Sequence, residues 1–341
     1  MSLFKGISLI KLIFLGTFIL LLSVLTGCGK NEPVSKTDLA MGTVITQLIY
    51  GNDANEVSNN IINQINDLEM NYLSWRINSS DVARINAFSG SLVKVDSRTL
   101  SWIRLSTDIS GNCGGVFDIT VGKLTDLWGI GGDNADLPSQ EDINAAVKTI
   151  DYRSIRLSET QVEIADGQSL DLGAVGKGIA CDIIRDLLKK SSVEGAVISV
   201  GGSILLYGEN PKADSWTVGI KHPRGDSYVI TIPLKETCIS TSGDYERFLE
   251  KDGKTYHHIL DPKTGYPADS DIISATVICD SGLLSDALST ACFILGYEKS
   301  LPLLEKYSAQ AVFIDKDFNV YATDGIVDLL SINNDDFKLT R

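Results

Sequence analysis

The spacing of apolar positions divides the chain into predicted strands and helices. Residues 41–50 alternate apolar and polar side chains and are rich in β-branched types, which predicts a strand. Short strands, broken by turns that contain Gly, Pro and Asp, are expected at 155–173 and between 196 and 278. Helices and strands are segregated rather than regularly alternating, which favours the α+β class. Apolar positions at three- and four-residue steps predict amphipathic helices at 54–73, 96–109 (closed by Gly111), 179–188 and 283–295.

The first 27 residues have the three parts of an export signal. Lys5 and Lys11 give a positive flank, and residues 12–22 form an apolar run that is shorter than the ~20 residues of a stable membrane span. The run ends in LTGC, which resembles the lipobox of bacterial lipoproteins. We therefore predict a signal peptide at 1–27 and a lipid on Cys28 that anchors the protein to the extracytoplasmic face of a cell membrane. The alternatives are a plain transmembrane anchor and a secretory signal that is cut elsewhere.

The composition of the rest of the chain limits the classes of partner. Residues 28–37 are polar and are expected to form a flexible tether, and residues 38–341 to form one large domain. Loss of two lysines with the signal changes the net charge from −14 to −16, so the surface repels phosphate backbones and nucleic acid is not an expected partner. The five cysteines other than Cys28 lack CxxC spacing, which predicts buried thiols rather than a disulfide framework or a zinc site.

Residues 171–182 (DLGAVGKGIACD) form the first candidate site. We expect a strand that ends in Asp171, then a glycine-rich turn, then a helix. This layout directs free backbone N–H groups and Lys177 toward a bound phosphate. The segment is not a Walker A loop, because no Ser or Thr follows the lysine. A plain strand-to-helix turn is the alternative.

Asp286 and Thr290 form a second candidate site. They are four residues apart on a predicted helix, so their side-chain oxygens point the same way. A carboxylate, a hydroxyl and nearby main-chain carbonyls suit Mg²⁺ well and zinc poorly. The alternative is an aspartate near the helix start that interacts only with the helix dipole.

Two of the three histidines and several aromatic residues are further candidates. His257 and His258 lie between a strand-like run and a turn that contains Pro and Gly. A histidine is the natural group to deprotonate a hydroxyl nucleophile, although a surface or hydrogen-bonded pair is the alternative. Two glycines at 114–115 precede Phe117 and Trp128, whose rings could contact a planar ligand or pack in the core.

These stretches together closely resemble the ApbE family of FAD:protein FMN transferases, in consistent order from Met41 to about Gly296. Two positions depart from the commonest family pattern: Gly176 stands where alanine is usual, and Lys123 where proline is usual. Neither removes a ligand. The matching motifs are MGT (41–43), LSWRINSSDVARIN (73–86), FDITVG (117–122), LWG (127–129), DLGAVGKG (171–178), SVGGS (199–203), VGIKHP (218–223), TSGDY (241–245), HILDPKTGYP (258–267) and DALST (286–290).

The resemblance implies a fold, an activity and a set of site residues. The fold would be an ApbE-like (T-fold-like) single large domain of mixed antiparallel sheets and packed helices. The activity would be Mg²⁺-dependent transfer of FMN from FAD to a threonine or serine hydroxyl of an acceptor protein, with release of AMP. His258 would be the base, with His257 second. The metal ligands would be Ala174, Asp286, Ser289 and Thr290, and the FAD-binding positions would be Met41, Trp75, Val116, Phe117, Asp118, Asp171, Lys177 and Ile259.

Two other functions stay open at this point. Water could replace the acceptor, which would make the protein an FAD pyrophosphatase that yields FMN and AMP. A lipid-anchored flavin-binding protein without catalysis is the third possibility. For the transferase, the resemblance suggests acceptors among the flavin-carrying subunits of membrane redox complexes or extracytoplasmic reductases.

Overall fold

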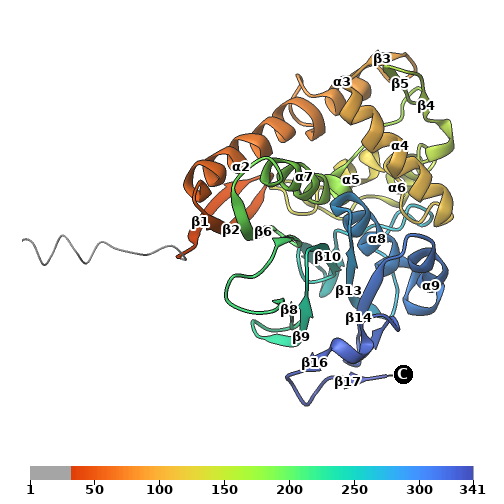
Figure 1. Cartoon of the computed structure of the whole chain (residues 1–341). Coiled ribbons are helices and arrows are strands. Elements are labelled where there is room, and N and C mark those ends of the chain that lie inside the picture. Colours follow the sequence, from red (N-terminus) through yellow and green to blue (C-terminus); the bar gives the residue numbers. More distant parts are fainter. Residues whose placement is uncertain (1–31, 341) are drawn as a thin grey trace, which may run out of the picture.

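The computed structural model describes residues 32–340, and a nine-stranded sheet runs through the centre of this part (Figure 1). Its strand order is β1-β2-β6-β7-β10-β13-β14-β15-β17, and every neighbouring pair is antiparallel except β15 and β17. The α+β class predicted from the sequence is therefore confirmed. The strands are β1 (Val34–Ala40), β2 (Thr43–Gly51), β6 (Val193–Val200), β7 (Ser203–Gly208), β10 (Thr237–Gly243), β13 (Ile272–Cys279), β14 (Gln310–Asp315), β15 (Asn319–Ala322) and β17 (Lys338–Leu339).

Helices cover one face of this sheet and enclose the main core. The predicted helix at 54–73 is present as α2 (Ala54–Leu68), followed by a π-helical turn at Glu69–Leu73. The predicted helix at 283–295 is α8 (Gly282–Leu295), and Gly296 follows it as expected. The other helices on this side of the molecule are α4 (Ser97–Asn112), α7 (Gly173–Leu188) and α9 (Tyr297–Lys306).

The opposite face of the sheet packs against a smaller three-stranded sheet and forms a second apolar cluster. That sheet has the order β16-β9-β8, and Figure 1 shows it below the central sheet. Helices α5 and α6 form a third small core around Trp128. The remaining elements are β8 (Trp216–Lys221), β9 (Tyr228–Leu234), β16 (Ser331–Ile332), β3 (Val93–Lys94), β4 (Arg156–Leu157), β5 (Gln161–Glu163), β11 (Phe248–Lys251), β12 (Lys254–His257), α3 (Asp81–Ala87), α5 (Gly122–Trp128) and α6 (Gln140–Val147).

The N-terminal boundary of the domain differs from the prediction. Strand β1 pairs with β2 from Val34 to Ala40, so residues 34–37 are part of the sheet and not of a tether. The segment has no apolar alternation because the inward-facing positions of β1 are Val34, Lys36, Asp38 and Ala40, two of which are charged. The predicted signal peptide and Cys28 lie outside the described residues. Within the described part, no helix is long and apolar enough to cross a membrane.

Two predicted element boundaries are also wrong. Helix α4 continues to Asn112, so Gly111 lies in its last turn and does not close it. The expected strand up to Asp171 and the glycine-rich turn after it are absent, because α7 already begins at Gly173. Within this segment, Gly178 lies inside α7 and packs directly against the backbone of α8. The five cysteines of the described part are free and buried, as predicted.

Candidate active site

The site is built on a very close contact between α7 and α8. A Cβ atom added to Gly178 would lie 2.0 Å from the carbonyl oxygen of Gly282 and 2.8 Å from Cβ of Asp286. A Cβ at Gly282 would in turn lie 2.2 Å from the carbonyl oxygen of Gly178. Only glycine permits this backbone-to-backbone approach. The contact brings Asp286 of α8 against the N-terminal half of α7.

Asp286 is a buried carboxylate with two partners on α7. Its Oδ2 accepts a hydrogen bond from the backbone N–H of Gly178 at 2.9 Å, and its Oδ1 lies 3.3 Å from Nζ of Lys177. The Asp286 side chain is only 5% exposed, whereas the Lys177 side chain is 29% exposed. A buried carboxylate needs compensating charge and hydrogen bonds, and both come from α7. The lysine keeps access to solvent and therefore to a ligand.

Hydroxyl groups surround the next turn of α8. Ser289 donates to the main-chain oxygen of Asp286 at 2.8 Å, and the Thr290 hydroxyl lies 3.5 Å from the same oxygen. On β10, the Ser242 hydroxyl lies 2.8 Å from that of Ser289 and 3.4 Å from that of Thr290. Sequence reasoning missed Ser242, because its role depends on β10 lying beneath α8.

The arrangement provides hard oxygen donors suited to Mg²⁺. The candidate ligands are the Asp286 carboxylate, the Thr290 hydroxyl and the carbonyl oxygens of Ala174 and Ser289. Ala174 lies in the first turn of α7 and Ser289 is buried on α8. Among the described residues, no group of three or more His, Cys, Asp or Glu side chains could hold a metal ion. A cation here would therefore depend on this set of one carboxylate, one hydroxyl and main-chain carbonyls, which matches the preference of Mg²⁺ for oxygen.

The two adjacent histidines have different surroundings. Nε2 of His257 lies 3.0 Å from the carbonyl oxygen of Ala268, and Nδ1 accepts from the backbone N–H of Ile259 at 3.3 Å. Its ring also packs edge-on against Phe293 at 5.4 Å between centroids. Both nitrogens of His257 are thus occupied by the protein. Burial of the ring lowers the pKa of His257, so it is neutral at pH 7.

His258 keeps one nitrogen free. Its Nδ1 lies 3.2 Å from the carbonyl oxygen of Arg247, which can only accept, so we assign the proton to Nδ1. Nε2 then carries a lone pair and has no hydrogen-bond partner among the described residues. Burial, aided by the positive charges of Lys177 and Arg247, lowers the pKa of His258 to about 4. The imidazole is therefore neutral at pH 7 and able to accept a proton.

Met41 lies in a tight turn beside α7. Met41 and Gly42 have φ angles of +51° and +65° and join β1 to β2. Glu69 accepts the backbone N–H of Met41 at 3.0 Å, and the methyl group of Met41 lies 3.3 Å from where a Cβ on Gly176 would be. The structure therefore brings Met41 to the helix that carries Lys177.

The carboxylates of the two aspartates predicted to bind FAD accept hydrogen bonds from other residues of the protein. Asp118 is buried, and it accepts from the backbone N–H and hydroxyl of Thr120 and from the backbone N–H of Tyr152. Burial nevertheless raises the pKa of Asp118. Asp171 accepts from the backbone N–H of Gly173 at 2.7 Å and from the Thr125 hydroxyl at 2.8 Å. Asp171 thus fixes the start of α7, and the Asp118 carboxylate is engaged by Thr120 and Tyr152.

The remaining predicted flavin positions are apolar. Val116, Phe117 and Ile259 are buried in the main core. Their side chains pack inside the protein. Trp75 is partly buried at the edge of the same core, with the Arg76 guanidinium 4.1 Å from its ring.

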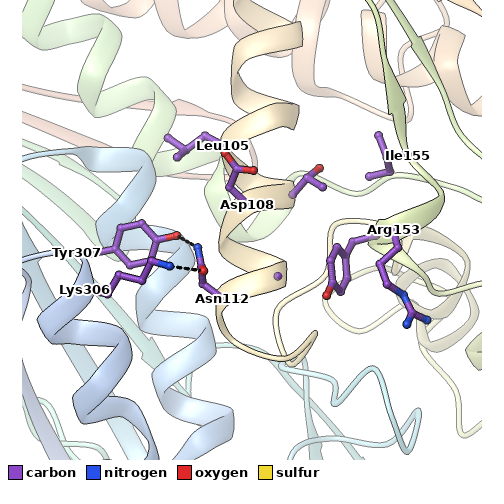
Figure 2. Close-up of a pocket in the computed structure, with 10 residues that line it drawn as sticks. Leu105, Asp108, Asn112, Arg153, Ile155, Lys306 and Tyr307 are labelled. Carbon is purple, nitrogen blue, oxygen red and sulfur yellow. Dashed lines mark hydrogen bonds between the residues drawn. The ribbon is translucent and has the colours of Figure 1, made fainter.

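A separate hollow of about 610 Å³ lies between α4, α9 and residues 152–155. Figure 2 shows Asn112 bonded to both Tyr307 and Lys306 on one side of this hollow, with Arg153 and Ile155 on the other side. None of the predicted site residues lines it. The candidate chemistry therefore lies elsewhere, around the contact of α7 with α8.

The comparison with known proteins decides the family. The ApbE family model matches residues 41–314, which begin at the Met41 turn and include α7, α8 and both histidines. The chain belongs to the ApbE family. It is 33% identical to an FAD:protein FMN transferase of Treponema pallidum, over 96% of this chain and 98% of that protein. It is 32% identical to a protein of the same name from Klebsiella pneumoniae, over 86% of this chain and 92% of that protein.

Solved structures of ApbE proteins have the same fold. The ApbE protein of Thermotoga maritima matches with a TM-score of 0.80 and 30% identity, over 86% of this chain and 98% of that one. The flavinyl transferase ApbE of Pseudomonas stutzeri matches with a TM-score of 0.77 and 29% identity, over 88% and 97%. The α7–α8 contact and the His258 segment thus lie within a fold shared along nearly the whole length of these ApbE proteins.

Proposed function

We propose that this protein transfers FMN from FAD to a threonine or serine hydroxyl of an acceptor protein, with release of AMP. The names of its ApbE relatives support the reaction. The observation that carries the proposal is His258, a neutral imidazole whose Nε2 is free and whose pKa responds to the charge of Lys177. A base and a cation for the diphosphate therefore lie in one site.

Each residue then has a defined task. His258 Nε2 accepts the proton of the acceptor hydroxyl while the hydroxyl oxygen forms a bond to the phosphorus of the FMN half. The bond between that phosphorus and the bridging oxygen breaks, and AMP leaves with this oxygen. Lys177 offsets charge on the diphosphate. Asp286, Thr290 and the carbonyls of Ala174 and Ser289 would hold Mg²⁺, which would neutralise further phosphate charge when bound. The Met41 turn, Asp171 and the main chain of residues 116–118 would position the flavin nucleotide.

The test is incubation of the protein with FAD and Mg²⁺, with and without an acceptor domain. Transfer predicts that AMP release requires the acceptor and that FMN becomes covalently bound to it. AMP release at the same rate without an acceptor would identify an FAD pyrophosphatase. Tight FAD binding without any AMP would identify a flavin-binding protein that lacks catalysis.

We also propose that the enzyme works at the outer face of a cell membrane, anchored by a lipid on Cys28. Five residues separate Cys28 from Val34, where β1 begins, and their extended length is about 20 Å. Strand β1 adds about 23 Å before the turn at Met41. The site would then lie within about 45 Å of the anchor. Membrane redox proteins with an exposed threonine are the expected acceptors. Labelling with radioactive palmitate that persists in a Cys28→Ala variant would contradict the anchor.

A further inference from the structure

Arg247 reaches from the segment between β10 and β11 to the Met41–Gly42 turn. Its Nη2 donates to the carbonyl oxygen of Gly42 at 3.2 Å. Its aliphatic part passes Gly131 so closely that a Cβ on that glycine would lie 3.0 Å from Cδ of Arg247. The side chain is thus supported between the Met41–Gly42 turn and the loop that follows α5.

The charge of Arg247 is not compensated locally. In residues 32–340, its side chain has no carboxylate partner, and its bond to Gly42 is to a neutral carbonyl. Lys177 differs, because its charge is opposed by Asp286 at 3.3 Å. One guanidinium N–H donates to the carbonyl oxygen of Gly42, and the other N–H groups remain available to a ligand.

Arg247 is also next to the proposed base. Its main-chain oxygen accepts from the backbone N–H of His258 at 3.1 Å and from the ring Nδ1 of His258 at 3.2 Å. Its charge acts on the His258 ring in the same direction as that of Lys177. Lys177, Arg247 and His258 therefore converge on one region, beside the turn that carries Met41.

We propose that Arg247 binds the diphosphate of FAD as the second cation of the site, in addition to Lys177. The inference rests on the proposed FMN transfer, which brings a dianionic diphosphate to His258. With Lys177 already opposed by Asp286, the protein needs another positive group to hold the two phosphates, and a guanidinium can bind phosphate oxygens in a fork. Arg247 is the uncompensated cation placed to do so.

The experiment measures FAD and ADP binding to Arg247→Gln, Arg247→Lys and a matched control, Lys254→Gln. Lys254 is an exposed lysine on β12 of the same hairpin, so its variant makes the same change in net charge away from the site. We expect Arg247→Gln to bind both nucleotides about ten- to a hundredfold more weakly, because it loses a charge-assisted hydrogen bond. Arg247→Lys should lose less, and Lys254→Gln should bind like wild type. The salt dependence of FAD binding should become shallower only in Arg247→Gln.

Two other results would overturn the proposal. In the first, Arg247→Gln binds FAD and ADP normally and only the KM for the acceptor rises, which would place the guanidinium on the acceptor. In the second, Arg247→Lys binds as weakly as Arg247→Gln and both melt at a lower temperature, which would make the bond to Gly42 purely structural. Lys177→Gln separates this proposal from the proposed function. If the wild type binds FAD and Lys177→Gln binds it weakly, the proposed FAD site is supported independently of the result for Arg247.

Discussion

The two walls of the proposed site are built in different ways. One wall is the α7–α8 pair, where Gly178 and Gly282 meet backbone to backbone and Asp286 is buried. The other wall is the segment from β10 to β12, where Arg247 is exposed and holds His258 through its main-chain oxygen. Changes in the first wall should therefore disturb the fold and metal binding. Changes in the second should alter the rate or the binding of FAD while the fold remains.

Gly178→Ala should have the largest effect on stability. Its Cβ would lie 2.0 Å from the carbonyl oxygen of Gly282, and backbone cannot move aside as a side chain can. We expect a loss of about 3 kcal/mol or more in the free energy of unfolding, measured by urea denaturation. Unfolding at the wild-type urea concentration would contradict the close packing of α7 and α8.

Asp286→Ala should abolish Mg²⁺-dependent turnover. The variant removes the only side-chain carboxylate of the proposed ligand set and leaves Lys177 without its partner. We expect the rate of AMP release to fall at least about a hundredfold. The measurement is the rate against Mg²⁺ concentration, and an unchanged Mg²⁺ dependence would place the ion elsewhere.

His258→Ala should slow the reaction by about 10²- to 10⁴-fold and leave FAD binding unchanged, because only the base is lost. The neighbouring His257→Gln is the matched control. Gln can still donate to the carbonyl oxygen of Ala268, so this variant should keep a rate close to that of wild type. An equal loss of reaction rate in the two variants would contradict the assignment of His258, rather than His257, as the base.

The pH dependence should report the low pKa of His258. Because the folded-state pKa, about 4, lies below the ordinary value of 6.5, the unfolded chain binds more protons between these pH values. Stability should therefore fall as the pH decreases from about 6.5 to 4, and it should fall less in His258→Ala. The acid limb of kcat/KM, which reports the pKa of the free enzyme, should likewise lie near pH 4. An acid limb near pH 6.5 would indicate a solvated histidine.

Gly176→Ala should have the smallest effect. Only the ends of two flexible side chains, Met41 and Leu73, lie within 3.4 Å of the added Cβ. Replacing glycine inside a helix should then stabilise the protein by up to about 1 kcal/mol, measured by the same denaturation. Gly178 lies two residues later on the same helix. The difference between the two variants in the free energy of unfolding therefore measures the cost of the clash with the backbone of Gly282. A loss of stability similar to that of Gly178→Ala would contradict this contrast.

The sequence predicts the long elements better than the short ones. Helices α2 and α8 follow from their apolar period, because one whole face of each is buried. Strand β1 has no apolar alternation to predict it, because its inward-facing positions include Lys36 and Asp38 while Leu39 faces outward. The glycine-rich segment at 173–178 predicts a turn but forms the start of α7, because the sequence does not show that another backbone approaches Gly178.

The sequence also identifies candidate side chains without their environments. The family resemblance ranks His258 above His257, but the residues alone do not explain the ranking. The physical difference lies in contacts with Ala268, Ile259 and the carbonyl oxygen of Arg247. Ser242 was missed for the same reason, since it reaches the site only through the packing of β10 under α8. Such distinctions depend on contacts between segments that are distant in the chain.

The most direct test of the account is mass spectrometry of a candidate acceptor incubated with this protein, FAD and Mg²⁺. The account predicts one FMN added to a threonine or serine, an equal amount of AMP, and almost no product with His258→Ala. AMP without any change in the mass of the acceptor, or normal flavin attachment by His258→Ala, would contradict it.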